Sequence, residues 1–84
     1  MNLSETSDLI LRRLIQFDES LRNVHIPKDI NLLDSGFLDS IKFIDFVISL
    51  QSDFNKEIDF ELVDLSNHST VWGLSELFSE SSLD

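Results

Sequence analysis

The sequence has no cysteine and no tyrosine, and only two glycines and one proline among its 84 residues. The lack of cysteine excludes disulfide bonds, thiolate metal sites and a cysteine nucleophile. Few glycine and proline residues mean few forced chain breaks, which favours a helical bundle over a turn-rich β fold. No apolar run approaches the roughly 18 residues that span a bilayer. The sequence also opens without the pattern of a signal peptide, so we expect no membrane insertion and a cytoplasmic location.

Basic residues are scarce. Six lysines and arginines stand against 16 acidic residues, which gives a net charge of -10. This charge argues against binding to nucleic acid or to an anionic membrane surface, because both would repel the chain. It favours partners with basic docking faces, since opposite fields steer encounter. A second interpretation is that the acidity only keeps a small protein soluble.

Hydrophobic residues make up 42% of the chain, including seven phenylalanines and one tryptophan. This content supports one small domain over residues 1–84 with a modest core, and a tail over residues 79–84 with too little apolar content to be held firmly. No Ser-His-Asp order, glycine-rich phosphate loop or metal-ligand pattern is present. We therefore expect a protein that is not an enzyme. We also expect it to be a monomer.

The apolar spacing predicts an all-α fold. A first helix is expected over residues 4–17, capped by Ser4 or Ser7, and a second over residues 40–53. The long loop between them carries many apolar residues, so we expect it to be pinned onto the core. A short third helix is expected near residues 60–65, capped by Asp59, followed by a turn over residues 66–68. A last helix begins after Ser69 or Thr70. The residues expected to line the interior are Phe43, Phe46, Leu50, Val71 and Phe78.

The second helix carries more apolar residues than its core face requires. Ile41, Ile44 and Ile48 form an additional row on the side from which Ser40 projects. Exposure would make this row a partner-binding patch, whereas burial would simply widen the core. Asp45 lies on the polar side of the same helix. Glu61 and Asp64 are most simply solvated, although partners could also use them.

The two histidines and the tryptophan lie outside any recognisable site pattern. We interpret His25 and His68 as solvated loop residues, because no carboxylate–histidine spacing suggests a metal site. Trp72 is interpreted as a partly buried packing residue.

Ser40 is the candidate site. It stands where the second helix begins, next to Asp39, and the free N–H groups and dipole of a helix N-terminus stabilise a phosphate ester. Asp39 would present the serine to a metal-dependent modifying enzyme. The competing interpretation is that Ser40 only caps the helix. Ser35 forms a second Asp-Ser pair, but Gly36 places it in a turn without a long apolar helix behind it.

The order of these features resembles the acyl carrier protein family. The chain reads Leu-Asp-Ser-Gly-Phe-Leu-Asp-Ser-Ile over residues 33–41, then an apolar helix, Glu-Ile-Asp over residues 57–59 and Ser-Thr-Val over residues 69–71. The resemblance extends from the first helix to Phe78. It implies a small four-helix bundle in which Ser40 carries a covalent 4'-phosphopantetheine arm derived from coenzyme A. The arm's thiol would hold an acyl or aminoacyl group as a thioester.

The resemblance also implies partners: a phosphopantetheinyl transferase, a ligase that loads the acyl or aminoacyl group, and an acyltransferase or condensing enzyme. Two residues separate Gly36 from the Asp-Ser pair, where carriers of primary fatty acid synthesis usually have one. Positions that are often acidic hold Lys42, Gln51 and Ser52. We therefore expect a specialised or aminoacyl (D-alanyl) type of carrier. The alternative from another class is an unmodified acidic helical protein-interaction module.

Overall fold

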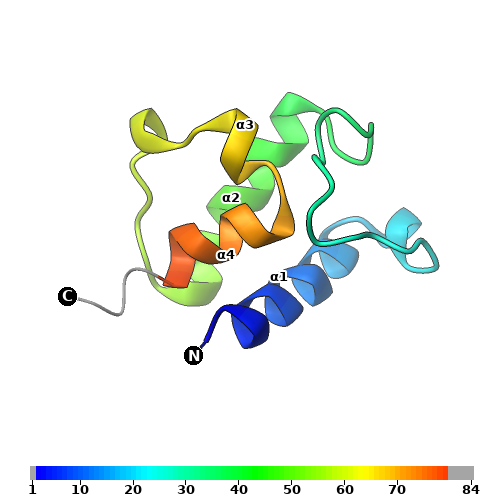
Figure 1. Ribbon diagram of the computed structural model, residues 1–84, viewed down its shortest axis with the longest axis horizontal. Helices are drawn as coiled ribbons and strands as arrows, with labels where there is room; N and C mark the ends of the chain where they lie inside the picture. Colours follow the sequence, from blue (N-terminus) through cyan, green and yellow to red (C-terminus); the bar gives the residue numbers. More distant parts are fainter. Residues whose placement is uncertain (1, 80–84) are drawn as a thin grey trace.

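The computed structural model describes residues 2–79, which form helices without any strand in that range. Figure 1 shows α1 lying beside α4, with α2 behind α4 and α3 at the top of the view. The predicted all-α class with four helices is confirmed. The elements are α1 (Leu3–Phe17), η1 (Glu19–Leu21), α2 (Ser40–Phe54), η2 (Phe60–Leu62), α3 (Leu65–His68) and α4 (Val71–Ser79), where η marks a 3₁₀ turn.

α1 begins earlier than the sequence suggested. Asn2 is its N-cap, and the Asn2 side chain accepts a hydrogen bond from the Glu5 backbone N–H at 2.8 Å. The expected caps Ser4 and Ser7 are wrong, because both residues lie inside the helix. The Ser7 hydroxyl is buried and donates to the Ser4 carbonyl at 2.8 Å.

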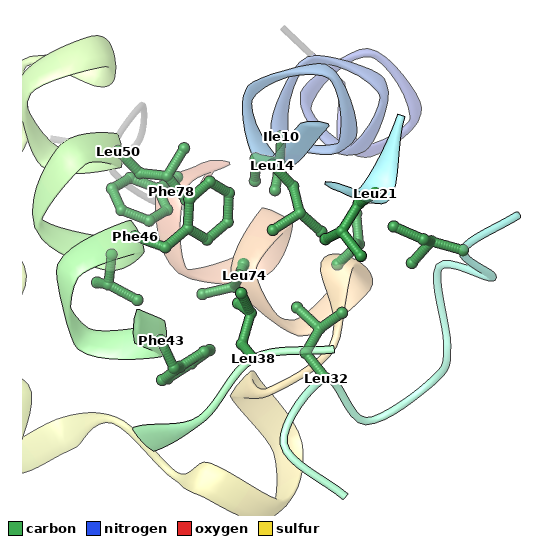
Figure 2. Close-up of a cluster of buried hydrophobic side chains, with 13 residues drawn as sticks. Ile10, Leu14, Leu21, Leu32, Leu38, Phe43, Phe46, Leu50, Leu74 and Phe78 are labelled. Atoms are coloured by element: carbon green, nitrogen blue, oxygen red, sulfur yellow. The ribbon is translucent and has the colours of Figure 1, made fainter. Parts of the chain in front are cut away.

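One cluster of buried side chains joins α1, α2, α4 and the long loop (Figure 2). The five side chains predicted to line the interior are all buried, so this prediction is confirmed. Two ring contacts connect the helices: Phe17 with Phe46 at 5.4 Å and Phe54 with Phe78 at 5.1 Å between centroids. Such aromatic pairs add about 0.5–1.5 kcal/mol each beyond the area they bury. The buried apolar residues are Ile10, Leu14, Leu21, Ile26, Leu32, Leu38, Phe43, Phe46, Val47, Leu50, Val71, Leu74 and Phe78.

The long loop between α1 and α2 is fixed to the bundle, as predicted. Leu21, Ile26, Leu32 and Leu38 are buried in the core cluster. Backbone hydrogen bonds attach the same loop to the start of α4: Leu32 N–H donates to the Ser69 carbonyl at 2.8 Å, and the Trp72 N–H donates to the Lys28 carbonyl at 3.0 Å.

Lys28 adds a side-chain anchor for this loop. Its ammonium lies 2.5 Å from an Asp8 carboxylate oxygen of α1 and 5.0 Å from the centroid of the Trp72 ring. Trp72 is 38% exposed and is not one of the residues packed against the core cluster, so it is more exposed than the predicted partly buried packing residue.

The region of the expected third helix contains two short elements instead of one. Asp59 caps η2 as predicted, because its carboxylate accepts from the Glu61 N–H at 3.0 Å. α3 then forms over residues 65–68, where a turn was expected, so that prediction is wrong. The physical reason is Asp64, whose side chain supplies a second N-cap just after η2 ends.

Gly73 allows α3 to approach α4 very closely. A Cβ atom at this position would lie 1.9 Å from the Asn67 carbonyl oxygen and 2.8 Å from the His68 Cα. Since both atoms belong to the backbone of α3, they cannot move aside as a flexible side chain would. The Gly73 N–H donates to the Thr70 hydroxyl at 2.8 Å, so Thr70 is the residue that caps α4.

Within residues 2–79, no helix is both long and apolar enough to cross a membrane. Ser79 ends α4, and its hydroxyl donates to Thr6 of α1 at 3.1 Å. The remainder of the expected tail, residues 80–84, lies outside the described residues.

Candidate functional site

Ser40 is the first residue of α2, and Asp39 caps that helix. The Asp39 carboxylate accepts from the Lys42 N–H at 2.8 Å. Because Asp39 fills the capping role, the interpretation of Ser40 as the cap is wrong. Ser40 is exposed, and its hydroxyl has no hydrogen-bond partner in the described part of the chain. An open hydroxyl therefore stands in solvent where the helix begins.

The turn before Ser40 is held by a buried side chain and several hydrogen bonds. Gly36 has φ = +83°, a left-handed conformation that favours glycine. The buried Leu38 side chain anchors the end of the turn, and its N–H donates to the Leu32 carbonyl at 3.0 Å. The Asn31 side-chain oxygen accepts hydrogen bonds from the backbone N–H groups of Leu33 and Asp34, at 2.9 Å each. These contacts fix the direction from which the chain enters α2.

Ser35, the rival serine, is differently placed. Its hydroxyl lies within this turn, donates to the Leu32 carbonyl at 3.3 Å and accepts from the Phe37 N–H at 3.4 Å. Its oxygen therefore already has two backbone partners. Sequence spacing favoured Ser40 over Ser35, and the hydrogen bonds of the two hydroxyls favour the same choice.

The isoleucine row lies on the surface beside Ser40. Ile41 is 74%, Ile44 46% and Ile48 49% exposed, so the interpretation of the row as core is wrong. Residues three and four apart share one face of a helix, which makes these three side chains neighbours. Asp45 is also exposed, one helical turn beyond Ile41. α2 thus brings Asp39, Ser40, the isoleucine row and Asp45 together.

The two acidic candidates further along the chain lie on other elements. Glu61 is an exposed residue of η2. Asp64 is exposed as well, but its carboxylate is engaged in capping α3. It accepts from the Ser66 hydroxyl at 2.7 Å, from the Ser66 N–H at 3.0 Å and from the Asn67 side chain at 2.7 Å.

These hydrogen bonds lower the pKa of Asp64 below its ordinary value of 3.8, with the Ser66 hydroxyl as the largest cause. A depressed folded-state pKa stabilises the fold above pH 3.8, and this contribution is lost as the pH falls through the folded-state pKa. We expect the thermal midpoint to fall on acidification below that point. Asp64→Asn keeps a capping side chain that does not titrate, so its midpoint should fall less steeply. Equal slopes for both proteins, measured by circular dichroism, would contradict this.

Two features of this region were missed by reasoning from the sequence. His68 is half-buried rather than a solvated loop residue, and its Nδ1 accepts from the Asp64 N–H at 2.8 Å. Gly73 looks unremarkable inside an apolar pattern. The hydrogen bond to His68 uses only the backbone N–H of residue 64, so the sequence carried no specific signal for it, and nothing in the sequence identified the close helix contact either. His25 is exposed, as expected.

The residues around Ser40 fit a phosphate ester. Helix N-terminal N–H groups have no intrahelical partner, and the Asp39 carboxylate occupies only that of Lys42. The helix dipole adds partial positive charge at the same end of α2. No group of three or more metal-ligating side chains occurs within residues 2–79.

The comparison with protein families agrees with this geometry. The model of the family described as "Phosphopantetheine attachment site" matches residues 10–78, which include the whole of α2 and Ser40. No curated protein and no solved structure gives a significant match. Because the matched range covers most of the 84 residues, the chain belongs to the phosphopantetheine attachment-site family of carrier proteins, whose cofactor is a covalently bound 4'-phosphopantetheine.

Proposed function

We propose that Ser40 is the attachment site and that the protein carries an acyl or aminoacyl group among the enzymes of a specialised biosynthetic pathway. The observation that supports this assignment is the exposed, unpaired Ser40 hydroxyl at the start of α2, where Asp39 already provides the cap. When bound, the arm supplies a thiol for thioester formation. The chain itself orients the arm and binds the partner enzymes, and we propose that it catalyses no reaction.

Carrier domains of this family generally interact with phosphopantetheinyl transferases and biosynthetic enzymes. For this chain we propose three kinds of partner: a phosphopantetheinyl transferase, a ligase that loads the acyl or aminoacyl group, and an acyltransferase or condensing enzyme. A cytoplasmic location and a monomeric state remain predictions.

The specialised subtype is supported by the residues around the site. Lys42, Gln51 and Ser52 reduce the acidity of α2, so docking would depend more on its apolar row. The two residues between Gly36 and Asp39 lengthen the turn that positions the serine. Both features favour a pathway with its own ligase or synthase over primary fatty acid synthesis. An aminoacyl (D-alanyl) group is the cargo that the resemblance to specialised carriers suggests.

The distribution of charge along the sequence supports docking through the acidic part of the chain, to which α2 belongs. Residues 1–28 hold four acidic and four basic residues and are neutral, whereas residues 29–84 hold twelve acidic and two basic residues. The isoleucine row therefore lies in the acidic part of the chain. A complementary partner would offer an apolar groove with a basic rim.

Substitution of Ile48 tests this docking face. Because Ile48 is half exposed, Ile48→Glu should change the free energy of unfolding by only about 0.5 kcal/mol. Binding to a partner enzyme should weaken about tenfold or more, since a charge would face an apolar groove. The matched control is Leu3→Glu on α1, where Leu3 is similarly exposed. A large loss of stability, or equal binding losses for both variants, would refute the docking role.

The function itself is tested by mass spectrometry of the chain incubated with coenzyme A and a broad-specificity phosphopantetheinyl transferase. We expect one phosphopantetheine per chain. Tryptic cleavage after Lys28 and Lys42 releases residues 29–42, which contain both Ser35 and Ser40. Fragmentation of this peptide should place the added mass on Ser40. An unchanged mass would instead favour the unmodified interaction module, and modification of Ser35 would refute the assigned site.

A further inference from the structure

α3 is a helix of four residues that is closed on itself by hydrogen bonds. The Asp64 N–H donates to His68 Nδ1 at 2.8 Å, and the His68 N–H donates back to the Asp64 carbonyl at 2.6 Å. The Asp64 carboxylate also accepts hydrogen bonds from the backbone N–H and the hydroxyl of Ser66. A helix this short has little intrinsic stability. Its shape therefore depends on these bonds and on its contact with α4.

The bond from the Asp64 N–H requires one protonation state of His68. A ring nitrogen that accepts a hydrogen bond carries no proton, so the imidazole is neutral with its proton on Nε2. Protonation adds a second N–H at Nδ1, and two donors then face each other. We propose that His68 is a pH-sensitive switch in α3, whose protonation breaks the bond from the Asp64 N–H and turns the ring toward the Asp64 carboxylate. This proposal goes beyond the carrier function and does not depend on it.

Asp64, the N-cap of α3, is a charged group that interacts electrostatically with this ring. Its hydrogen bonds hold its pKa below the ordinary value, so it stays ionised over the range in which histidines titrate. None of the ionisable residues on the neighbouring elements forms an ion pair with His68 within residues 2–79. Those residues are Glu76 of α4 and, on the long loop, Lys28 and Asp29. Glu76 lies one helical turn after Gly73, and Lys28 forms an ion pair with Asp8.

A continuous path of backbone hydrogen bonds connects α3 with the segment that presents Ser40. Ser69 follows α3, and its carbonyl accepts from the buried Leu32 N–H at 2.8 Å. The Leu32 carbonyl accepts from the Leu38 N–H at 3.0 Å, two residues before Ser40. A rearrangement of α3 should therefore be detectable at the Leu32 amide, which lies far from His68 in the sequence.

The test is an NMR titration of the ¹⁵N-labelled protein between pH 8 and pH 5. The Asp64 amide shift should follow the His68 ring with a single shared midpoint. Below that midpoint, the protection factor of the Leu32 amide should fall about threefold to tenfold, the effect of weakening one ordinary hydrogen bond. If the Asp64 amide shift in the native protein does not change with pH together with the His68 ring signals, the proposal is wrong, and no variant is needed to show this.

Two histidine variants complete the test. His68→Gln removes the titrating group, so both pH effects should disappear. His25→Gln, at an exposed loop residue, should leave both effects unchanged. Persistence of the Leu32 effect in His68→Gln, or its loss in His25→Gln, would assign the pH dependence to another group and refute the switch.

Discussion

Ser40→Ala should abolish phosphopantetheinylation completely. The substitution removes the one oxygen that we propose as the acceptor, and no neighbouring hydroxyl can replace it at the start of α2. Alanine is a good residue inside a helix and Asp39 remains as the cap, so the fold should be unaffected. Intact mass after incubation with coenzyme A and transferase is the measurement. Circular dichroism should show native helicity and an unchanged thermal midpoint.

Two other serines provide matched controls. Ser35 belongs to the turn before α2, and Ser4 is an exposed residue in the first turn of α1. Ser4, the second residue of α1, therefore offers another exposed serine in the first turn of a helix, without the turn that precedes Ser40 and without the isoleucine row. Ser35→Ala and Ser4→Ala should both be modified as fully as the native chain. Modification of Ser40→Ala, or its loss in either control, would show that the site is elsewhere.

Gly73→Ala should strongly destabilise the protein. Helix propensity alone predicts the opposite, a gain of about 1 kcal/mol, because alanine replaces glycine inside α4. The added Cβ would lie 1.9 Å from the Asn67 carbonyl oxygen, however, so α3 and α4 must separate. Overpacking of this kind costs about 2–3 kcal/mol, which lowers the thermal midpoint of a small domain by roughly 10 °C or more.

The control for this substitution is Glu76→Ala, at an exposed position on the same helix. It should change the free energy of unfolding by no more than about 0.5 kcal/mol. Chemical denaturation of the two variants and the native chain measures both effects. A stabilised Gly73→Ala variant would show that α3 does not press against α4 in solution.

The main helices could be predicted from the sequence because their apolar residues recur at helical spacing. That spacing identified α2 and its buried residues, such as Phe43 and Phe46, as well as the apolar loop that is held against the core. α3 could not be predicted in this way. It spans only about one helical turn, too short for apolar residues to recur, and a carboxylate at Asp64 and the absence of a side chain at Gly73 determine where it forms.

The candidate site, too, could be predicted from the sequence only in part. Sequence spacing singled out Ser40, but Asp39 and Ser40 are both good capping residues, and only the backbone geometry shows which of them caps α2. Exposure of Ile41 and its neighbours depends on how much of α2 the other elements cover. A single helix pattern cannot show this, because it contains no information about the packing of distant segments.

The contact of Lys28 with Trp72 gives the molecule a built-in optical probe. Trp72 is the only tryptophan and the chain has no tyrosine, so ultraviolet emission comes almost entirely from one indole. The Lys28 ammonium lies 5.0 Å from the centroid of that ring, and the Trp72 backbone N–H donates to the Lys28 carbonyl of the loop at 3.0 Å. Emission intensity and wavelength should therefore report, without any label, whether the loop stays closed while an enzyme engages the carrier.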